Sequence, residues 1–494
     1  MGRGTIVPLP MTDLPNPHSR AALAARFGLN YRWYVLLTVM IGSMAAIMAS
    51  TIINVAVPDM SRVFTLGQER AQWLAAGFMA AMTLSMLTTP FLLERFGYRH
   101  TYLGAVLLLM CGGIAGGLSS GFDLVLAMRV VEGLAAGVLQ PIPAIIILRA
   151  FERGEQGRAM GIFGLGVVLA PALGPSVGGV LVEWFGWRSI FFVVVPFCAV
   201  AAVLAQRYLP VGGPGGSVVG PGAARLDKTG LAMVSVAVLS LLNGMVGLHG
   251  GSPLIGAALL ALSAVTVAIF IHHQRRIEKP LMALALFGFD TFSMGAVVAF
   301  IYGMGLFGST YLVPVFMQLA LHLPPSQAGA VLFPAGVVLA LTIPLAGRLA
   351  DRLPVARIVS AGLVLLAGSF FAMMSVSLTT ALLLITLWAV LGRIGLGLIL
   401  PSLNLGAMRG LPDGLISHGS STINFMRQLG GAVGVSLVGI VLEWRLQAQP
   451  ATPLRAFHET FLLIGVVTAL AVLAAWRMKP PAPAAQPLSA SASS

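Results

Sequence analysis

Charge is scarce in this sequence of 494 residues: Asp, Glu, Lys and Arg together make up 9%, against about 25% in soluble domains. Hydrophobic residues make up 57%, and the mean hydropathy is +0.93. A soluble chain of this composition could not cover its surface with polar groups. The scarcity excludes a soluble enzyme, a secreted disulfide scaffold and a disordered protein, and it leaves a membrane protein with several spans.

Cysteine and nucleotide-binding motifs are almost missing. The two cysteines, Cys111 and Cys198, fall inside apolar runs, where a thiol behaves as a small hydrophobic group. No G-x-x-x-x-G-K-[ST] motif is present, so the sequence gives no sign of a P-loop ATP-driven pump. Because the apolar runs contain no cluster of His, Cys and acidic residues, we predict no enzyme, no metal site and no cofactor.

Basic residues exceed acidic ones, and the formal net charge is +13. They lie mostly in short loops between apolar runs, which favours contact with lipid headgroups and not with nucleic acid. With the N-terminus placed in the cytoplasm, 21 of the 29 basic residues fall on the cytoplasmic side and 5 on the opposite side. This bias predicts a multi-pass protein of the inner (plasma) membrane with both termini in the cytoplasm.

Fourteen apolar runs are long enough to cross a bilayer, which takes about 20 residues. They are 33–57, 71–93, 101–120, 123–148, 157–183, 187–207, 229–248, 253–272, 292–319, 327–347, 357–377, 380–408, 419–444 and 459–477. The predicted regions are a cytoplasmic tail (1–32), an N-terminal six-helix bundle (33–208), a Pro/Gly-rich linker (209–228), two inserted helices with a loop (229–291), a C-terminal six-helix bundle (292–478) and a disordered tail (479–494).

An internal repeat supports this division. An acid-Arg pair, Glu94-Arg95, follows the second run, and Asp351-Arg352 follows the tenth. The fourth run contains Arg129-Val-Val-Glu132-Gly133, and the twelfth contains Arg393-Ile-Gly-Leu-Gly397. Matching motifs at matching places predict two six-span halves, with a binding site at their interface near the middle of the membrane.

Four motifs carry a resemblance to a known family. They are Thr51–Pro58 at the end of the first run, the loop Glu94–Arg99, Ala170–Gly179 in the fifth run and Arg427–Gly431 in the thirteenth. The chain resembles the major facilitator superfamily, specifically its fourteen-span drug:proton antiporter branch. The resemblance implies an all-α polytopic membrane protein of the major-facilitator type, with 14 transmembrane helices arranged as 6+2+6.

The same resemblance implies a secondary active transporter that exports small hydrophobic or amphipathic compounds in exchange for protons, by alternating access. The alternatives are a dedicated exporter of a metabolite, lipid or siderophore, an uncoupled uniporter and, less favoured, a membrane scaffold. The expected partners are a small-molecule substrate, protons and the lipid bilayer; a periplasmic adaptor is compatible with this class. The chain departs from the branch at Ala49, where an Asp is usual, at Glu132, where a Gln is common, and at Val194, where an Asn is usual.

Glu132 is the only acidic residue well inside an apolar run. It lies nine residues after Asp123, roughly 14 Å along a helix, and hence near the middle of a hydrocarbon core about 30 Å thick. Arg129 is three residues earlier and shares its helix face. We predict that Glu132 and Arg129 form a proton-coupling site; the alternative is a static ion pair.

The remaining site predictions fall into three groups. The acid-Arg loops form a cytoplasmic gate: Glu94, Arg95, Gly97, Arg99, Asp351 and Arg352. Small residues and prolines that bend the fifth span and allow close packing form the antiporter motif: Pro171, Gly174, Pro175, Gly178 and Gly179. Polar and flexible residues within the spans line a substrate cavity: Asn54, Met48, Ala49, Asn243, Asn424 and Arg427. Arg427 either neutralises an anionic ligand or bonds to helix carbonyls.

Overall fold

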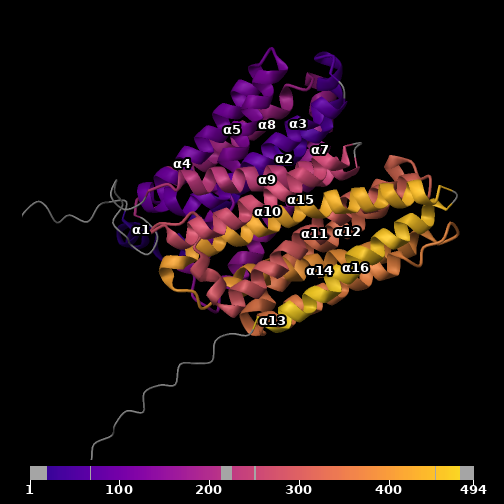
Figure 1. Cartoon of the computed structure of the whole chain (residues 1–494). Coiled ribbons are helices and arrows are strands. Elements are labelled where there is room, and N and C mark those ends of the chain that lie inside the picture. Colours follow the sequence, from indigo (N-terminus) through magenta and orange to yellow (C-terminus); the bar gives the residue numbers. More distant parts are fainter. Residues whose placement is uncertain (1–18, 67, 213–224, 250–251, 451, 479–494) are drawn as a thin grey trace, which may run out of the picture.

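The regular elements of the described chain are all helices (Figure 1). The computed structural model describes residues 19–66, 68–212, 225–249, 252–450 and 452–478. Most of the predicted linker and tails (1–18, 213–224 and 479–494) lies outside the described residues. Long apolar runs favour helices because a helix satisfies its backbone hydrogen bonds internally, as a bilayer requires.

The helices fall into three consecutive groups. The N-terminal half comprises, after the short α1 (Arg20–Phe27), α2 (Tyr31–Val63), α3 (Gln68–Ser85), α4 (Thr89–Leu118), α5 (Phe122–Leu139), α6 (Ile142–Ala150), α7 (Gln156–Phe185) and α8 (Ser189–Tyr208). The inserted pair is α9 (Lys228–His249) and α10 (Pro253–Arg276). The C-terminal half comprises α11 (Asp290–Leu319), α12 (Pro325–Arg352), α13 (Val355–Met373), α14 (Leu382–Met408), α15 (Ile416–Ala448) and α16 (Pro453–Trp476).

The two halves repeat the same packing. Helix α2 packs against α7 and α8, as α11 packs against α15 and α16. Helix α5 packs against α3 and α4, as α14 packs against α12 and α13. The internal repeat in the sequence therefore corresponds to a repeat of helix contacts.

Twelve segments of the described residues are long and apolar enough to cross a membrane, whereas the sequence predicted fourteen. The difference lies in the N-terminal half. Arg70–Leu118 is counted as a single segment, although the backbone leaves the helical conformation at Gly97. In the fifth predicted span, only Gln156–Ala170 is counted, as a shorter apolar helix.

The inserted pair lies between the two halves on the face shown in Figure 1. A small cluster of buried side chains joins it to both halves, and it includes Leu87 next to α3, Val234 of α9 and Phe425 of α15. Asp227 directly precedes α9 and accepts hydrogen bonds from the Gly230 amide (2.8 Å), His273 Nε2 (2.9 Å) and Gln274 Nε2 (2.5 Å).

The side chain of Asp227 is almost fully buried by these contacts. Burial would raise the pKa of Asp227, but the hydrogen bonds from Gly230, His273 and Gln274 outweigh it and hold this pKa below its usual range. The carboxylate therefore ties the start of α9 to the end of α10.

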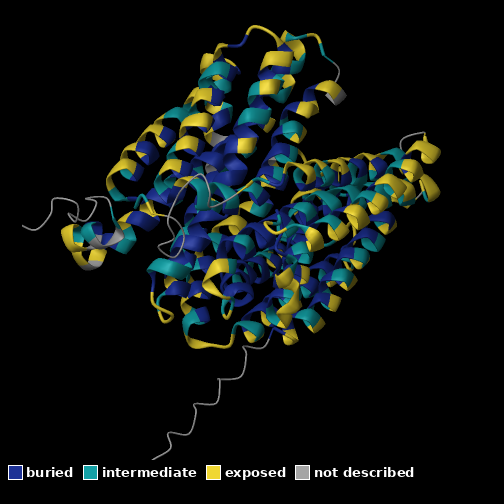
Figure 2. Ribbon diagram, turned by 60° about the vertical axis from the view of Figure 1, so that its left-hand side comes forward, coloured by how far each residue is buried: buried dark blue, intermediate teal, exposed yellow. Residues whose placement is uncertain are grey.

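The halves meet closely at one end of the molecule, the Glu94/Asp351 end, defined by these two residues. Here Arg149 donates to the Asp413 carbonyl, Arg409 Nη2 donates to the Arg153 carbonyl (3.2 Å), and Ser420 Oγ donates to the Pro141 carbonyl farther inside (2.8 Å). Buried residues gather where the halves meet (Figure 2).

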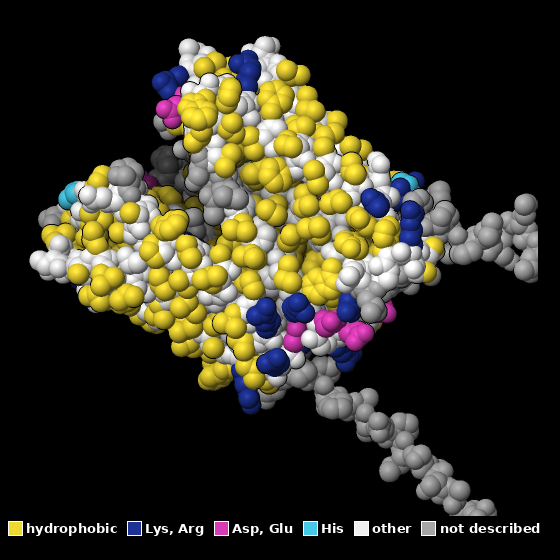
Figure 3. Space-filling model, turned by 180° about the vertical axis from the view of Figure 1, so that it is seen from behind, with side chains coloured by type: hydrophobic (Ala, Val, Ile, Leu, Met, Phe, Trp, Pro, Cys, Tyr) yellow, Lys and Arg dark blue, Asp and Glu magenta, His cyan; other side chains and the backbone are white. Residues whose placement is uncertain are grey.

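Away from this end the halves diverge, and the surface is hollowed between the two lobes when the molecule is seen from behind (Figure 3). On the same face, hydrophobic side chains cover the middle and charged side chains lie toward the edges. A broad apolar surface with charge at its margins suits a protein that is embedded in a bilayer.

Candidate functional site

A buried ion pair joins Arg129 and Glu132 of α5. Arg129 Nη1 donates to Glu132 Oε2 at 2.7 Å, and the two side chains are only 2% and 1% exposed. The spacing of three residues places both side chains on one helix face. The ion pair is therefore confirmed as a contact, while its role in proton coupling stays a prediction.

The rest of the Arg129 guanidinium is held by the neighbouring helices. Its Nε donates to the Leu74 carbonyl of α3 (3.3 Å), and its Nη2 donates to the Ala49 carbonyl of α2 (3.1 Å). It also lies over the Phe78 ring, 4.3 Å from the centroid. Ala49 thus offers Arg129 a backbone oxygen, and the carboxylate comes from Glu132.

Two glycines of α4 make room for the carboxylate. A Cβ added at Gly112 would lie 2.8 Å from Glu132 Cγ, and one added at Gly113 would lie 3.3 Å from Glu132 Oε1. The ion pair therefore lies at the junction of α2, α3, α4 and α5, inside the N-terminal half.

Two of the predicted gate residues, Asp351 and Glu94, lie where the halves touch. Asp351, near the end of α12, accepts hydrogen bonds from the amides of Gly157 (Oδ1, 2.7 Å) and Arg158 (Oδ2, 2.8 Å). These amides belong to the first turn of α7, where a helix has unpaired N–H groups and a partial positive charge. Arg409 Nη2 lies 3.5 Å from Asp351 Oδ1. A carboxylate of one half therefore caps a helix of the other half.

The helices α7 and α12 cross without intervening side chains at this point. A Cβ added at Gly157 would lie 2.1 Å from the Gly347 carbonyl oxygen, and one added at Gly347 would lie 2.3 Å from the Gly157 carbonyl oxygen. One turn further along α7, a Cβ at Gly161 would lie 2.9 Å from Pro344 Cα. Only glycine permits backbones to approach so closely.

The corresponding acid in the N-terminal half, Glu94, has a looser contact. Its Oε1 lies 3.9 Å from His418 Nε2, in the first turn of α15. A cavity of about 580 Å³ adjoins this contact, lined among others by Arg225, Lys279 and Leu415. The inserted pair and its following loop thus border this side of the interface between the halves.

Three other predicted gate residues, Arg95, Gly97 and Arg99, lie in the turn after Glu94. Gly97 has φ 74° and ψ 177°, and a Cβ there would lie 2.2 Å from the Val211 carbonyl oxygen, so the turn requires glycine. The Arg99 amide donates to the Pro210 carbonyl (3.2 Å), and the Arg95 guanidinium lies over the Phe96 ring. Arg352 is exposed at the end of α12.

The predicted antiporter motif packs within the N-terminal half. A Cβ added at Gly174 would lie 2.7 Å from Thr51 Oγ1, and one at Gly178 would lie 2.6 Å from Ile52 Cγ1, both on α2. A Cβ at Gly179 would reach only ordinary contact with Val55, at 4.0 Å. The backbone stays helical through Pro171 and Pro175, whose side chains lie outside the described part of α7.

Two of the six predicted cavity residues line a pocket between the halves, Asn424 and Arg427. The pocket has a volume of about 20 Å³, room for about one water molecule. Its lining comes from both halves: Gln140, Ala144, Met160, Phe163, Gly164, Val167, Leu400, Pro401, Asn404, Asn424 and Arg427.

The other four predicted cavity residues lie elsewhere. Met48 and Ala49 are buried in the core of the N-terminal half, and Asn54 is exposed on α2. Asn243 is exposed on α9 and donates to the Leu239 carbonyl of its own helix (2.8 Å). The structure does not bring these four to the pocket between the halves.

Three groups of residues at or near these sites were not predicted from the sequence. The pocket includes Gln140 and Asn404, polar residues near the ends of apolar runs. His418 lies beside Glu94, and Tyr302 of α11 interacts electrostatically with both Arg393 and Arg427. The repeat could have pointed to Arg393, since it occupies the place of Arg129; nothing in the sequence connects Glu94 to His418.

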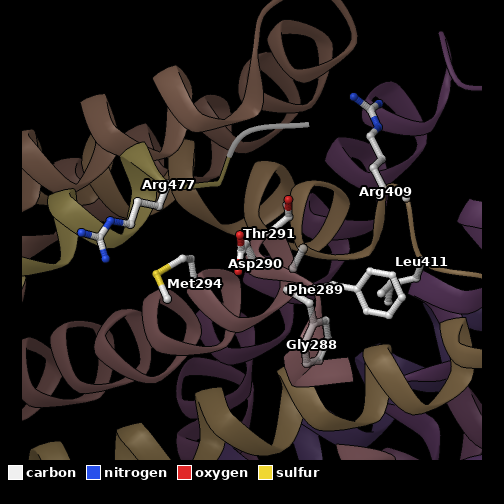
Figure 4. A pocket seen from close by; sticks show the side chains of 11 residues that line it. Gly288, Phe289, Asp290, Thr291, Met294, Arg409, Leu411 and Arg477 are labelled. Atoms are coloured by element: carbon white, nitrogen blue, oxygen red, sulfur yellow. The ribbon is translucent and has the colours of Figure 1, made fainter. Parts of the chain in front are cut away.

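A further cavity of about 720 Å³ lies within the C-terminal half, at the ends of α11, α14 and α16. Figure 4 shows Arg409 and Arg477 at opposite edges of it, with Asp290 and Thr291 between them. Among the described residues, no three His, Cys, Asp or Glu side chains gather as a metal site.

Two halves with repeated helix contacts and a pocket between them form the architecture of a secondary transporter. The chain belongs to the Major Facilitator Superfamily, whose family model matches residues 39–435. Members of this superfamily are transporters, generally not enzymes, and they bind small-molecule substrates.

Curated relatives include resistance proteins. The chain is 29% identical to the multidrug resistance protein B homolog of Mycobacterium tuberculosis (strain H37Rv), over 89% of this chain and 81% of that protein. It is 26% identical to the lincomycin resistance protein LmrB of Listeria innocua, over 83% of this chain and 86% of that protein. These relatives connect the chain with multidrug resistance proteins at moderate identity.

Solved structures share the fold. The human organic anion transporter MFSD10 superposes with a TM-score of 0.65 at 16% identity, over 90% of this chain and 99% of that one. The proton:xylose symporter XylE superposes with a TM-score of 0.64 at 12% identity, over 90% and 95%. At such identities the likeness concerns the fold alone.

Proposed function

We propose that the protein exports small hydrophobic or amphipathic compounds in exchange for protons, by alternating access. The observation that carries the proposal is Glu132, a carboxylate that is 1% exposed inside a bundle of membrane-length helices. Ionisable groups are costly at this depth and mark ion pathways in transporters. The resistance proteins among the relatives support a substrate class of drug-like compounds.

In this proposal, Glu132 exchanges its proton as the bundle moves. Arg129 stabilises the ionised carboxylate, and a proton on Glu132 would release this pairing. The contacts that Arg129 makes to α2 and α3 would then rearrange. Protonation is thereby coupled to the packing of the N-terminal half.

The Glu94/Asp351 end acts as the gate. The cap that Asp351 places on α7 holds the halves together, and it breaks when they separate. The glycines of the antiporter motif keep α7 tight against α2, so that α7 moves with its own half. Because the pocket between the halves holds about one water molecule, a larger substrate needs this movement in order to bind.

The proton gradient provides enough free energy. One pH unit corresponds to about 1.4 kcal/mol, and a membrane potential of 100 mV adds about 2.3 kcal/mol per charge. Together these allow on the order of 500-fold accumulation for each proton exchanged.

We propose a fourteen-span topology, arranged as 6+2+6. A single helix of the 49 residues in Arg70–Leu118 would be about 74 Å long, more than twice the hydrocarbon thickness of about 30 Å. The break at Gly97 supports two spans in this segment, and the 30 residues of α7 support one more. The excess of basic residues at the Glu94/Asp351 side supports a cytoplasmic location for both termini, in the inner membrane. A periplasmic adaptor is compatible with this arrangement.

An uncoupled uniporter is the second candidate. Ala49 takes the place of the acidic residue usual in the family branch, and the 2.7 Å contact between Glu132 and Arg129 suits a permanently ionised pair. In that case the pair would serve only the packing of the N-terminal half.

Transport by the purified protein in liposomes distinguishes the two candidates. We expect a pH gradient to accelerate lincomycin or lipophilic dye flux at least tenfold, and Glu132→Gln to abolish this acceleration. Glu152→Gln, in an exposed turn, serves as the matched control and should behave as the wild type. A pH response that survives in Glu132→Gln would contradict the proton role, and an absent response in the wild type would favour the uniporter.

A further inference from the structure

Two arginines inside the C-terminal half have no acidic partner among the described residues. Arg393 lies on α14 and Arg427 on α15, both within membrane-length segments. Arginine stays charged in proteins, and a charge at membrane depth is normally paired or faces a water-filled cavity. These two cations therefore require an explanation.

Arg427 makes a single side-chain hydrogen bond to a described residue. Its Nη2 donates to Asn424 Oδ1 at 2.8 Å, while Asn424 Nδ2 donates to the Ser420 carbonyl (2.9 Å). A guanidinium has five N–H donors, so most of its donors are not used in this contact. Arg427 lines the pocket between the halves, where these donors are available to a ligand.

Arg393 extends the same surface. It precedes Leu400 by seven residues and Asn404 by eleven, so the three lie on one face of α14, and both later residues line the pocket. Arg393 therefore lies roughly 10 Å further along this helix face. Its side chain forms no hydrogen bond or ion pair with the described residues, and it interacts electrostatically with the Tyr302 hydroxyl.

The repeat shows what Arg393 lacks. Arg129 is followed three residues later by Glu132, whereas Arg393 is followed three residues later by Leu396, which is 1% exposed. The N-terminal half neutralises its arginine with its own carboxylate. The equivalent position in the C-terminal half is apolar, so no described carboxylate neutralises Arg393, and an anionic ligand can do so.

We propose that the site between the halves takes amphipathic anions with one carboxylate. Arg393 and Arg427 bind the acidic group, because guanidinium groups match carboxylates in charge and geometry. The apolar body of the ligand packs on the wall formed by Met160, Phe163 and Leu400. This inference rests on the proposed export of amphipathic compounds and narrows their chemical class.

Three probes with one scaffold test the proposal. A dansyl group on an undecanoyl chain is prepared as the free acid, the methyl ester and the trimethylammonium analogue. Binding to the full-length protein in nanodiscs of neutral lipid is followed by dansyl fluorescence. We expect the acid to bind at least tenfold more tightly than the ester, and the cation to bind most weakly.

Variants then assign the preference to the two arginines. Arg393→Gln and Arg427→Gln should each bring the affinity for the acid to within about threefold of that of the same variant for the ester. Circular dichroism of each variant reports whether it is folded. Leu396→Glu should remove the preference by supplying the missing carboxylate. Arg455→Gln, an exposed arginine on α16, should keep it.

The outcomes separate this inference from the proposed function. Equal affinities for acid and ester in the wild type, or a preference that survives both arginine variants, would overturn the anion site and leave export of amphipathic compounds standing. Selective binding of the acid, combined with transport that ignores the pH gradient, would support the anion site and contradict proton coupling.

Discussion

Arg129 and Arg393 occupy matching positions in the two halves, but their side chains have different partners. Arg129 has a carboxylate at 2.7 Å, two backbone carbonyls and an aromatic ring. Arg393 has none of these partners among the described residues. A repeated sequence position can therefore keep its place in the fold while its charge has different roles. In one half the arginine stabilises the packing of helices, and in the other it is available to bind a ligand.

The acids at the Glu94/Asp351 end show the reverse asymmetry. Asp351 of the C-terminal half is bound directly to two amides in the first turn of α7. Glu94 of the N-terminal half lies 3.9 Å from a histidine in the first turn of α15, next to the cavity bordered by the inserted pair. The crossing of α7 and α12 is therefore the firm contact between the halves, and the crossing at α15 is the loose one.

We expect the largest effect, on the free energy of unfolding, when Arg129 and Arg393 are each replaced by leucine. Arg129→Leu leaves the Glu132 carboxylate buried without its partner, and we expect it to lower the free energy of unfolding by about 3–5 kcal/mol. Arg393→Leu removes a charge that has no acidic partner in the described chain, and we expect a loss below about 1 kcal/mol. Thermal unfolding of both variants in the same detergent measures the difference. Equal losses in the two variants would contradict it.

Two features of this arrangement could be predicted from the sequence. The spacing of Arg129 and Glu132 indicates a shared helix face, and the ion pair is present. The repeated motifs indicate two halves, and the helix contacts repeat accordingly. Such predictions succeed because they depend on neighbours within a helix, or on the order of helices, which periodicity and motif spacing encode.

Contacts between helices far apart in the sequence were beyond prediction. Asp351 binds backbone amides, which no side-chain pattern marks. Asn243 shows that a polar residue in an apolar run need not line a cavity, because its side chain can donate a hydrogen bond to a carbonyl of its own helix. The two glycines at the contact between the halves also lie outside the conspicuous glycine motif of α7. Gly157 is in the first turn of α7, and Gly347 is on α12.

The next effect concerns the firm crossing of α7 and α12. In Gly157→Ala the added Cβ would lie 2.1 Å from the Gly347 carbonyl oxygen, so the two helices must separate. Overpacking of this kind costs about 1–3 kcal/mol, which would shift the closed form of this end toward an open form. Spin labels at Glu152 and Pro412, on opposite halves, should report a longer distance.

Gly154→Ala provides the matched control, because a Cβ at Gly154 has no heavy atom within 4 Å. It should leave the distance between the labels unchanged. A distance that stays the same in Gly157→Ala would mean that the crossing is not what holds this end closed.

We expect the smallest effect when Asp351 and Glu94 are each replaced by alanine. Asp351→Ala removes the cap from the first turn of α7, which is worth about 0.5–2 kcal/mol, whereas Glu94→Ala removes a partly exposed contact worth less than about 1 kcal/mol. The same pair of spin labels should therefore show a larger open population in Asp351→Ala than in Glu94→Ala. Asp351→Asn removes the charge and keeps only one of the two acceptor oxygens, so it should give an open population between those of the wild type and Asp351→Ala. If Asp351→Asn retains the closed distance, the cap itself holds the halves together; if Glu94→Ala opens this end as much as Asp351→Ala does, the two crossings are equivalent and the asymmetry has no functional weight.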